Sequence, residues 1–210
     1  MRQAQTLNDA QLRRVIQYCR SRRHPTRDET IILVSFYAGL RAKEIAALTV
    51  GNVFDEAGDV RTQFILSAAQ SKGGHTHTVY LNQRLRKALL EYSASIRTAK
   101  PHHALFESQK GGHFSANTMC QLFLDIYKAV GLKDASSHSG RRTYITRLAN
   151  KGVGVRLLAE QGPVRVPEDL HRLDAAGVVE EPAAAREHHQ GVPLQLQQVP
   201  QARRVRAPRA

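Results

Sequence analysis

The sequence predicts a mainly α-helical domain with one small antiparallel β-hairpin or sheet, an α+β fold. Three observations predict it. Most stretches before residue 160 place apolar residues at helical spacing, residues 50–81 change to the pattern of extended chain, and residues 161–210 show neither pattern. We therefore expect an ordered domain over residues 1–160 and a poorly structured, low-complexity tail over residues 161–210.

Residues 6–20 predict the first helix. Apolar side chains recur there at i, i+3, i+4 and i+7, which makes one stripe along a helix: Leu12, Val15, Ile16 and Cys19. Thr6 is the expected N-cap, because its hydroxyl can accept a hydrogen bond from a free backbone N–H. Pro25 and the basic residues before it should end this helix.

A second helix is predicted directly after that proline. The sequence Thr26-x-x-Glu29 matches a capping box, in which two side chains satisfy free N–H groups at a helix start. The apolar run 31–38 leaves almost no polar face, and such a helix is expected to be buried. Gly39 provides the stop.

Residues 40–81 predict a short helix followed by a hairpin. The helix covers residues 40–48, and Arg41 lies in its first turn. Residues 61–67 and 76–81 are rich in β-branched and aromatic side chains, which favour strands. Between them Lys72 precedes two glycines, whose conformational freedom would let the hairpin tip approach a ligand closely.

Three more helices are expected towards residue 152. Residues 83–97 are amphipathic, and a further helix is capped by Ser115 and closed by Gly131. The last begins in the stretch 136–144 and continues to Gly152.

The start of the last helix is a candidate anion site. His138 and Arg141 are three residues apart, so they share one helix face. The free N–H groups and the dipole of a helix N-terminus favour a bound anion there, and a preceding serine can cap it. The pair can therefore hold a phosphate; the alternative is a capped amphipathic helix whose Arg141 faces water.

Basic residues outnumber acidic ones in the predicted domain. The chain has 31 Lys and Arg against 18 Asp and Glu, a formal net charge of +13. Residues 161–210 hold seven Arg against six acids, so nearly all of the excess belongs to residues 1–160. Such an excess favours a polyanionic partner, because Lys and Arg contact phosphates and release condensed counterions.

The two cysteines and the lengths of the apolar stretches indicate the cellular compartment. Cys19 and Cys120 are far apart and lie within helical patterns, so they read as core residues in a reducing compartment. No apolar stretch has the length of a signal peptide or a membrane span. We expect a cytoplasmic protein without a membrane partner.

Histidines suggest a metal site that other residues do not support. His75 and His77 alternate on one predicted strand, and His102 and His103 are adjacent in a predicted loop. No cysteine or carboxylate at ligand spacing accompanies them. We therefore expect solvated histidines and no bound metal.

Three motifs in order resemble the catalytic domain of tyrosine recombinases, the phage integrase family. They are residues 39–48 (GLRAKEIAAL), the hairpin tip 71–74 (SKGG) and residues 138–141 (HSGR). The resemblance covers about residues 6–160, which we expect to form an incomplete integrase-type catalytic domain. Because the pattern begins almost at Met1, no separate N-terminal DNA-binding domain is expected.

This resemblance implies site-specific DNA recombination or integration. In the family a tyrosine attacks a backbone phosphate of double-stranded DNA and forms a 3′-phosphotyrosyl link, without a metal or other cofactor. Strand exchange in the family also implies a homo-oligomer assembled on DNA. The expected activity is therefore cleavage and rejoining of DNA strands.

Five residues match the family's site positions. Arg41 and Arg141 match the two arginines that clamp the phosphate, and His138 matches a base or hydrogen-bonding position. Lys72 matches the hairpin lysine that protonates the leaving 5′-oxygen. Glu44 matches an acidic position that orients these cations.

The family's nucleophilic tyrosine has no match. All six tyrosines lie at or before Tyr144, which shares a helix with Arg141 and is expected to pack there. As written, the chain should bind DNA without cleaving it, because the covalent intermediate needs a nucleophile. The alternative is a non-catalytic basic DNA-binding protein.

The tail suggests why the nucleophile is missing. Residues 161–210 use only ten amino acid types, all of which have codons that begin with G or C. We interpret this as a GC-rich gene read out of frame after a frameshift near residues 152–161. The alternative is a natural low-complexity tail.

Overall fold

The computed structural model describes residues 4–71, 74–96 and 100–150, all within one compact unit. Its elements, in chain order, are α1 (Asp9–Arg20), α2 (Pro25–Tyr37), α3 (Ala42–Ala46), α4 (Val50–Val53), β1 (Gln63–Leu66), β2 (His77–Tyr80), α5 (Gln83–Ser93), α6 (Ala116–Ala129) and α7 (Ser139–Asn150). The expected fold class, mainly helical with a small antiparallel sheet, is confirmed. The predicted tail, residues 161–210, and the proposed frameshift lie outside the described residues.

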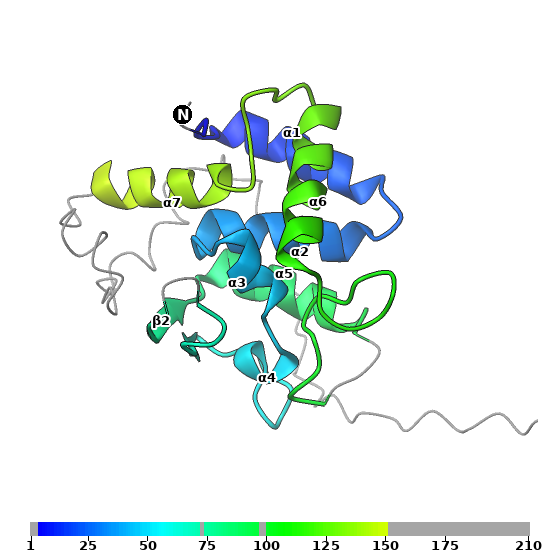
Figure 1. Ribbon diagram of the computed structural model, residues 1–210, viewed down its shortest axis with the longest axis vertical. Coiled ribbons are helices and arrows are strands. Elements are labelled where there is room, and N and C mark those ends of the chain that lie inside the picture. The colour runs from blue at the N-terminus through cyan, green and yellow to red at the C-terminus, as the bar shows by residue number, and fades with distance from the viewer. Residues whose placement is uncertain (1–3, 72–73, 97–99, 151–210) are drawn as a thin grey trace, which may run out of the picture. The chain divides into compact units, whose positions relative to one another are not determined.

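Helix α2 is the central element of the core. Its residues 31–36 are all buried, as the continuous apolar run predicts. Helices α1, α3, α5 and α7 pack against it (Figure 1). Helix α6 packs against α1 and α3 and thereby completes the surroundings of the core. Gly39 follows α2 with φ +66°, so the predicted stop is confirmed.

The predicted cap of α1 is wrong. Asn8, and not Thr6, is the N-cap: its side chain accepts from the amide of Gln11 at 2.8 Å. The Gln11 side chain in turn accepts from the amide of Asn8 at 2.9 Å. Two side chains with capping-box spacing therefore place the helix start later than the single hydroxyl of Thr6 suggests.

The predicted capping box of α2 is also wrong. Pro25 already occupies the first turn, where its fixed φ and missing N–H suit a helix start. Thr26 is therefore inside the helix and hydrogen-bonds to Ser95, with 3.0 Å between the hydroxyl oxygens. Glu29 instead accepts two hydrogen bonds from Arg20 at 3.0 and 3.1 Å and joins α1 to α2.

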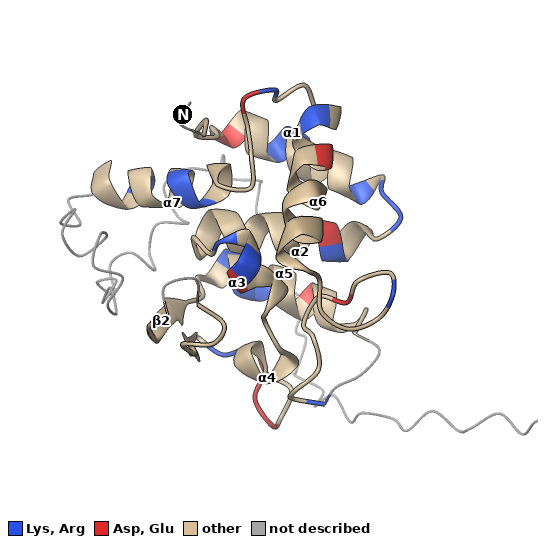
Figure 2. Ribbon diagram, viewed as in Figure 1, with Lys and Arg blue, Asp and Glu red and all other residues tan. Residues whose placement is uncertain are grey.

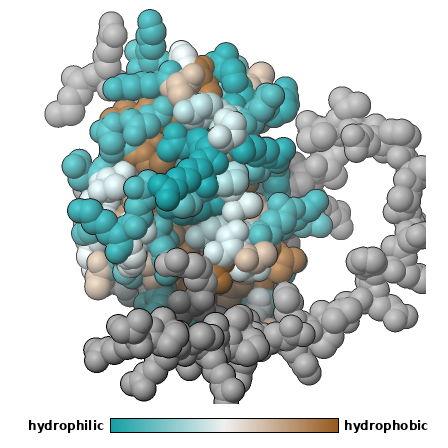
Figure 3. Space-filling model, turned by 90° about the vertical axis from the view of Figure 1, so that its right-hand side faces the viewer, coloured by the Kyte–Doolittle hydropathy of each residue, from teal (hydrophilic) through white to brown (hydrophobic). Residues whose placement is uncertain are grey.

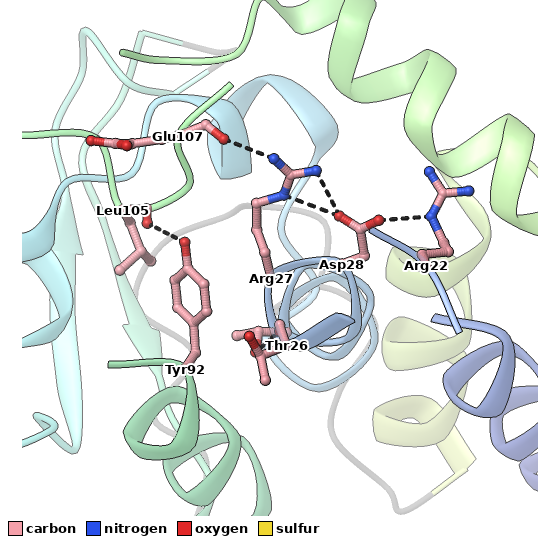
Figure 4. A network of polar contacts seen from close by, with 8 residues as sticks. Arg22, Thr26, Arg27, Asp28, Tyr92, Leu105 and Glu107 are labelled. Atoms are coloured by element: carbon pink, nitrogen blue, oxygen red, sulfur yellow. Dashed lines mark hydrogen bonds and ion pairs between the residues drawn. The ribbon is translucent and has the colours of Figure 1, made fainter. Parts of the chain in front are cut away.

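A buried carboxylate fixes the chain around the start of α2. Asp28 is 1% exposed and accepts from Arg22 at 2.7 Å and from Arg27 at 2.9 and 3.0 Å (Figure 4). Arg27 also donates to the carbonyl oxygen of Glu107 at 3.0 Å. These two arginines of the basic N-terminal part therefore serve the fold, because both donate to the same buried carboxylate.

The hairpin forms where the pattern becomes extended. Strands β1 and β2 pair antiparallel, with Gln63 opposite Tyr80 and Leu66 opposite His77. The stretch from residue 50 was expected to be extended throughout, but it begins with the short helix α4. The N-cap of α4 is Thr49, whose amide donates to the Asn52 side chain at 2.9 Å. Four residues are too few to show a helical stripe.

The face of the molecule drawn in Figure 3 is mainly hydrophilic. Hydrophilic side chains cover most of the face drawn in Figure 3, where hydrophobic ones form small separate areas. Within the described residues no helix has the length and apolar character needed to cross a membrane. Cys19 is fully buried and Cys120 is half-buried, so the first is a core residue as expected.

Candidate functional site

Arg41 is held rigidly at the start of α3. It is the N-cap, and its amide donates to Oε2 of Glu44 at 2.8 Å. Its Nη1 donates to Oε1 of the same carboxylate at 2.9 Å. Glu44 is fully buried, whereas the Arg41 side chain is 23% exposed. The buried carboxylate thus holds a cation that still reaches the surface. The positioning role of Glu44 at a phosphate stays a prediction.

Arg141 lies in the first turn of α7 and turns towards the end of α2. Its Nη1 donates to the carbonyl oxygen of Gly39 at 2.6 Å. Burial lowers the pKa of the Arg141 guanidinium, and the nearby charge of Arg41 lowers it further, while Glu44 opposes both. Arg41, Glu44 and Arg141 therefore lie within electrostatic reach of one another.

We name these three residues the arginine cluster. They come from sites about one hundred positions apart in the chain, and the fold brings them together at the junction of α2, α3 and α7. Two guanidinium groups accompany one carboxylate, so the cluster carries an excess positive charge. A guanidinium has five N–H donors in a planar fork, a geometry that fits the oxygens of a phosphate.

Two glycines allow α7 to come this close. A Cβ on Gly140 would lie within 3.0 Å of Ser35 in α2, closer than real Cβ contacts. A Cβ on Gly39 would lie within 3.0 Å of the ring of Tyr144. The missing side chains let the helices approach, and this approach sets the position of Arg141.

The N-terminal segment holds α7 from the other side. The amide of Leu7 donates to the hydroxyl of Thr143 at 2.8 Å, and Arg142 donates to the carbonyl oxygen of Ala4 at 2.9 Å. Arg147 forms an ion pair with Asp9 in the first turn of α1. Helix α7 is therefore fixed at three positions along its length.

Tyr144 packs where the sequence analysis expects it. Its ring lies against Gly39, on the helix that carries Arg141. Burial raises the pKa of the Tyr144 hydroxyl, although the charge of Arg141 acts in the opposite direction. A tyrosine in this environment is held as the neutral phenol at physiological pH.

The other two expected site residues are less well defined. His138 directly precedes α7 and is exposed, and its amide donates to the hydroxyl of Ser136 at 3.3 Å. Lys72 lies outside the described residues. The roles assigned to His138 and Lys72 stay predictions.

The adjacent histidines of the loop after α5 contact each other. The rings of His102 and His103 pack edge to face, with 4.6 Å between their centroids. Across the described ranges, no group of three or more His, Cys, Asp or Glu residues is arranged to hold a metal ion.

Sequence reasoning missed the backbone part of this site. The carbonyl of Gly39 anchors Arg141, yet a carbonyl has no signature in a sequence. Gly140 offered a signal, because a glycine within a helix often marks close packing.

Comparison with known proteins defines the family of this chain. The model of the phage integrase family matches residues 5–162, about three quarters of the sequence, and this range includes the whole arginine cluster. The chain belongs to the phage integrase family. The resemblance expected from the three motifs is thereby confirmed.

Curated relatives of this phage integrase family member include several tyrosine recombinases. Tyrosine recombinase XerD of Corynebacterium glutamicum is 28% identical over 138 residues, which cover 64% of this chain and 43% of the relative. Tyrosine recombinase XerC of Bacillus subtilis is 25% identical over 141 residues, covering 64% and 44%. The chain thus spans less than half the length of these relatives.

Solved structures share the fold of the family domain. The XerA recombinase has a TM-score of 0.59 and 23% identity, covering 74% of this chain and 54% of that one. The Tn1549 transposon integrase, solved in complex with transposon right end DNA, has a TM-score of 0.61 and 19% identity, covering 85% and 64%. The fold is that of a tyrosine recombinase catalytic domain.

Proposed function

We propose that this domain binds double-stranded DNA and holds one backbone phosphate between Arg41 and Arg141. The arginine cluster is the main support for this proposal. Two guanidinium groups lie within electrostatic reach of each other, and the single buried carboxylate of Glu44 neutralises only one of the two positive charges. The net charge of +13 supports a polyanionic ligand in the same way. A duplex supplies phosphates at a regular spacing on its outer surface.

The chemistry proposed for this site is site-specific recombination or integration. A tyrosine hydroxyl attacks the clamped phosphorus, a bond to the tyrosine oxygen forms, and the bond to the 5′-oxygen breaks. Lys72 supplies a proton to the leaving 5′-oxygen. The tyrosine proton passes to His138 acting as base or, where His138 only hydrogen-bonds the phosphate, to solvent water. The recombinase relatives and the transposon integrase solved with DNA support this proposal.

We further propose that this chain alone does not form the covalent link. The printed sequence has no tyrosine after Tyr144, and the ring of Tyr144 packs against Gly39. Its raised pKa also disfavours the phenolate that attack requires. A second subunit on the same DNA can supply the tyrosine instead; the alternative function is DNA binding without chemistry.

Two assays test these statements with the full chain. In the first, fluorescence anisotropy measures the affinity for a labelled duplex at several salt concentrations. We compare the parent with Arg41→Ala and Arg141→Ala, and with Arg13→Ala, which removes an exposed arginine of α1, as the matched control. Circular dichroism confirms that each variant is folded.

The expected result is salt-sensitive binding that both site variants weaken more than the control does. Binding that does not depend on salt, or equal losses in all three variants, contradicts the phosphate clamp. In the second assay the chain is incubated with nicked duplexes, which trap any covalent protein–DNA adduct because they prevent religation. An adduct on a denaturing gel contradicts inactivity of the chain alone.

A further inference from the structure

Arg84 lies over an aromatic ring at the C-terminal end of α2. It lies in the first turn of α5, and its guanidinium carbon is 5.4 Å from the centroid of the Tyr37 ring. Tyr37 is the last residue of α2 and is half-buried. The cation–π contact directs a long side chain that would otherwise sample many rotamers.

Arginines of two elements, α5 and α7, gather around this end of α2. Arg147 of α7 lies over Phe36, with 4.5 Å between its guanidinium carbon and the ring centroid. The rings of Phe36 and Tyr37 are 5.3 Å apart, and Arg84 occupies the Tyr37 side. Two residues further on, the carbonyl of Gly39 binds Arg141. Lys and Arg residues on α3, α5 and α7 are coloured blue in Figure 2.

These arginines differ in how their charges are compensated. Arg41 pairs with Glu44, and Arg147 pairs with Asp9. Arg84 is exposed and forms no ion pair with any residue in the described part of the chain. A directed, uncompensated cation at the surface is the arrangement that favours an external anion.

We propose that Arg84 binds a second DNA phosphate, next to the one that Arg41 and Arg141 hold. The proposal rests on the function proposed above and adds a residue that positions the duplex. Tyr37 and Gly39 are two residues apart, so their Cα atoms are separated by at most about 7.6 Å. Each strand of B-DNA carries one phosphate per about 3.4 Å of helix axis, so a duplex held at the arginine cluster presents further phosphates along the same surface.

Two other cations of α5 do not have this arrangement. Arg86 is half-buried and donates from Nη2 to the carbonyl oxygen of Val60 at 3.2 Å, so it serves the fold. Lys87 is exposed, but no aromatic ring in the described part of the chain lies beneath its ammonium group. Arg84 and Lys87 both border the groove between α5 and the loop around Asp59, which makes Lys87 a matched control.

The test is the salt dependence of duplex binding by the full chain, with an unspecific duplex of about two helical turns as probe. Arg84→Ala should raise Kd about five- to tenfold at 0.1 M salt and reduce the slope of log K against log salt by about 0.9. Arg84→Lys should keep the slope because it keeps the charge. Lys87→Ala should change Kd by less than about twofold.

The results for Arg84→Ala, Lys87→Ala and the parent test the role of Arg84 separately from the proposed function. An unchanged slope for Arg84→Ala, with the parent still binding, overturns the role of Arg84 and leaves the arginine cluster in place. Equal losses for Arg84→Ala and Lys87→Ala indicate a diffuse basic surface and also overturn it. A parent chain that binds no duplex contradicts the proposed function itself.

Discussion

Arg141 donates from Nη1 to the carbonyl oxygen of Gly39 at 2.6 Å, so the first turn of α7 is tied to the residue that ends α2. The ring of Tyr144, one turn along α7, packs on the same glycine. Gly39 therefore combines three tasks in one residue: it ends a helix, accepts a hydrogen bond from a candidate phosphate ligand and leaves room for an aromatic ring.

Gly39→Ala should destabilise the domain more than its backbone angle alone explains. Gly112 has the same φ of +66°, but a Cβ there would meet no atom within 4 Å, whereas on Gly39 it would meet the Tyr144 ring. Both variants have a strained left-handed residue, and only Gly39→Ala is overpacked, which costs about 1–3 kcal/mol more. Urea unfolding of Gly39→Ala and Gly112→Ala measures the difference, and equal stabilities would contradict the packing on Tyr144.

Ser35→Ala should stabilise the domain. The Ser35 hydroxyl is fully buried and has no hydrogen-bond partner among the described residues. Removing a buried, unsatisfied hydroxyl should raise the free energy of unfolding by about 1 kcal/mol. Thr143→Val is the control, because the Thr143 hydroxyl accepts from Leu7 and donates to Ser139, both at 2.8 Å. That variant should lose stability, and a similar loss for Ser35→Ala would refute the assignment.

Asp28→Asn should strongly destabilise the domain, whereas Asp9→Asn should not. Asp28 is buried between Arg22 and Arg27, and removing its charge leaves two cations without compensation. Breaking a buried pair costs about 3–5 kcal/mol, while an exposed pair contributes about 0–1 kcal/mol. The Asp9 side chain is 66% exposed in its pair with Arg147. Chemical denaturation of both variants checks the ranking, and a larger loss for Asp9→Asn would reverse it.

The two thiols should react at different rates. Burial, assisted by the charge of Asp28, raises the pKa of Cys19 to about 12, so almost no thiolate is present at pH 8. Cys120 is half-buried. Iodoacetamide at pH 8 should label one thiol per native chain and two per unfolded chain, as mass spectrometry can count. Cys120→Ser should abolish the native label; labelling that persists would place Cys19 in contact with solvent.

The same pKa shift makes stability depend on alkaline pH. The pKa of Cys19 is higher in the folded state than its ordinary value of 9.0. Its contribution is therefore fully present below pH 9 and is lost as the pH rises towards 12. The free energy of unfolding, measured by urea denaturation between pH 8 and pH 11, should therefore fall less steeply with pH in Cys19→Ala than in the parent.

Periodicity in the sequence predicts the long helices because it reports burial. The stripe Leu12, Val15, Ile16 and Cys19 is buried in α1, as expected. The helix starts were harder to predict, because several side chains near each start can cap it. Asn8, paired with Gln11, is the N-cap of α1 in place of Thr6. Helix α2 starts at Pro25, one residue before the expected capping box. Helix α4 was missed because it has less than two turns.

The arginine cluster could be predicted only from the order of its motifs. Arg41 and Arg141 are a hundred positions apart, and composition does not show that they meet. Glu44 was expected to orient the cations, and it binds Arg41 from a fully buried position. The support of Arg84 by Tyr37 depends on how α5 packs on α2, which no local pattern contains.

The contacts that hold α7 also set the order in which this site can form. Leu7 and Thr143 are 136 residues apart, and Ala4 and Arg142 are 138 apart. Domains emerge from the ribosome N-terminus first, and such distant pairings close the largest loops. A nascent chain that has released Arg41 therefore lacks its partner arginine until nearly all of the described residues have been synthesised. The arginine cluster is a product of completed folding, and an unfinished domain holds only part of it.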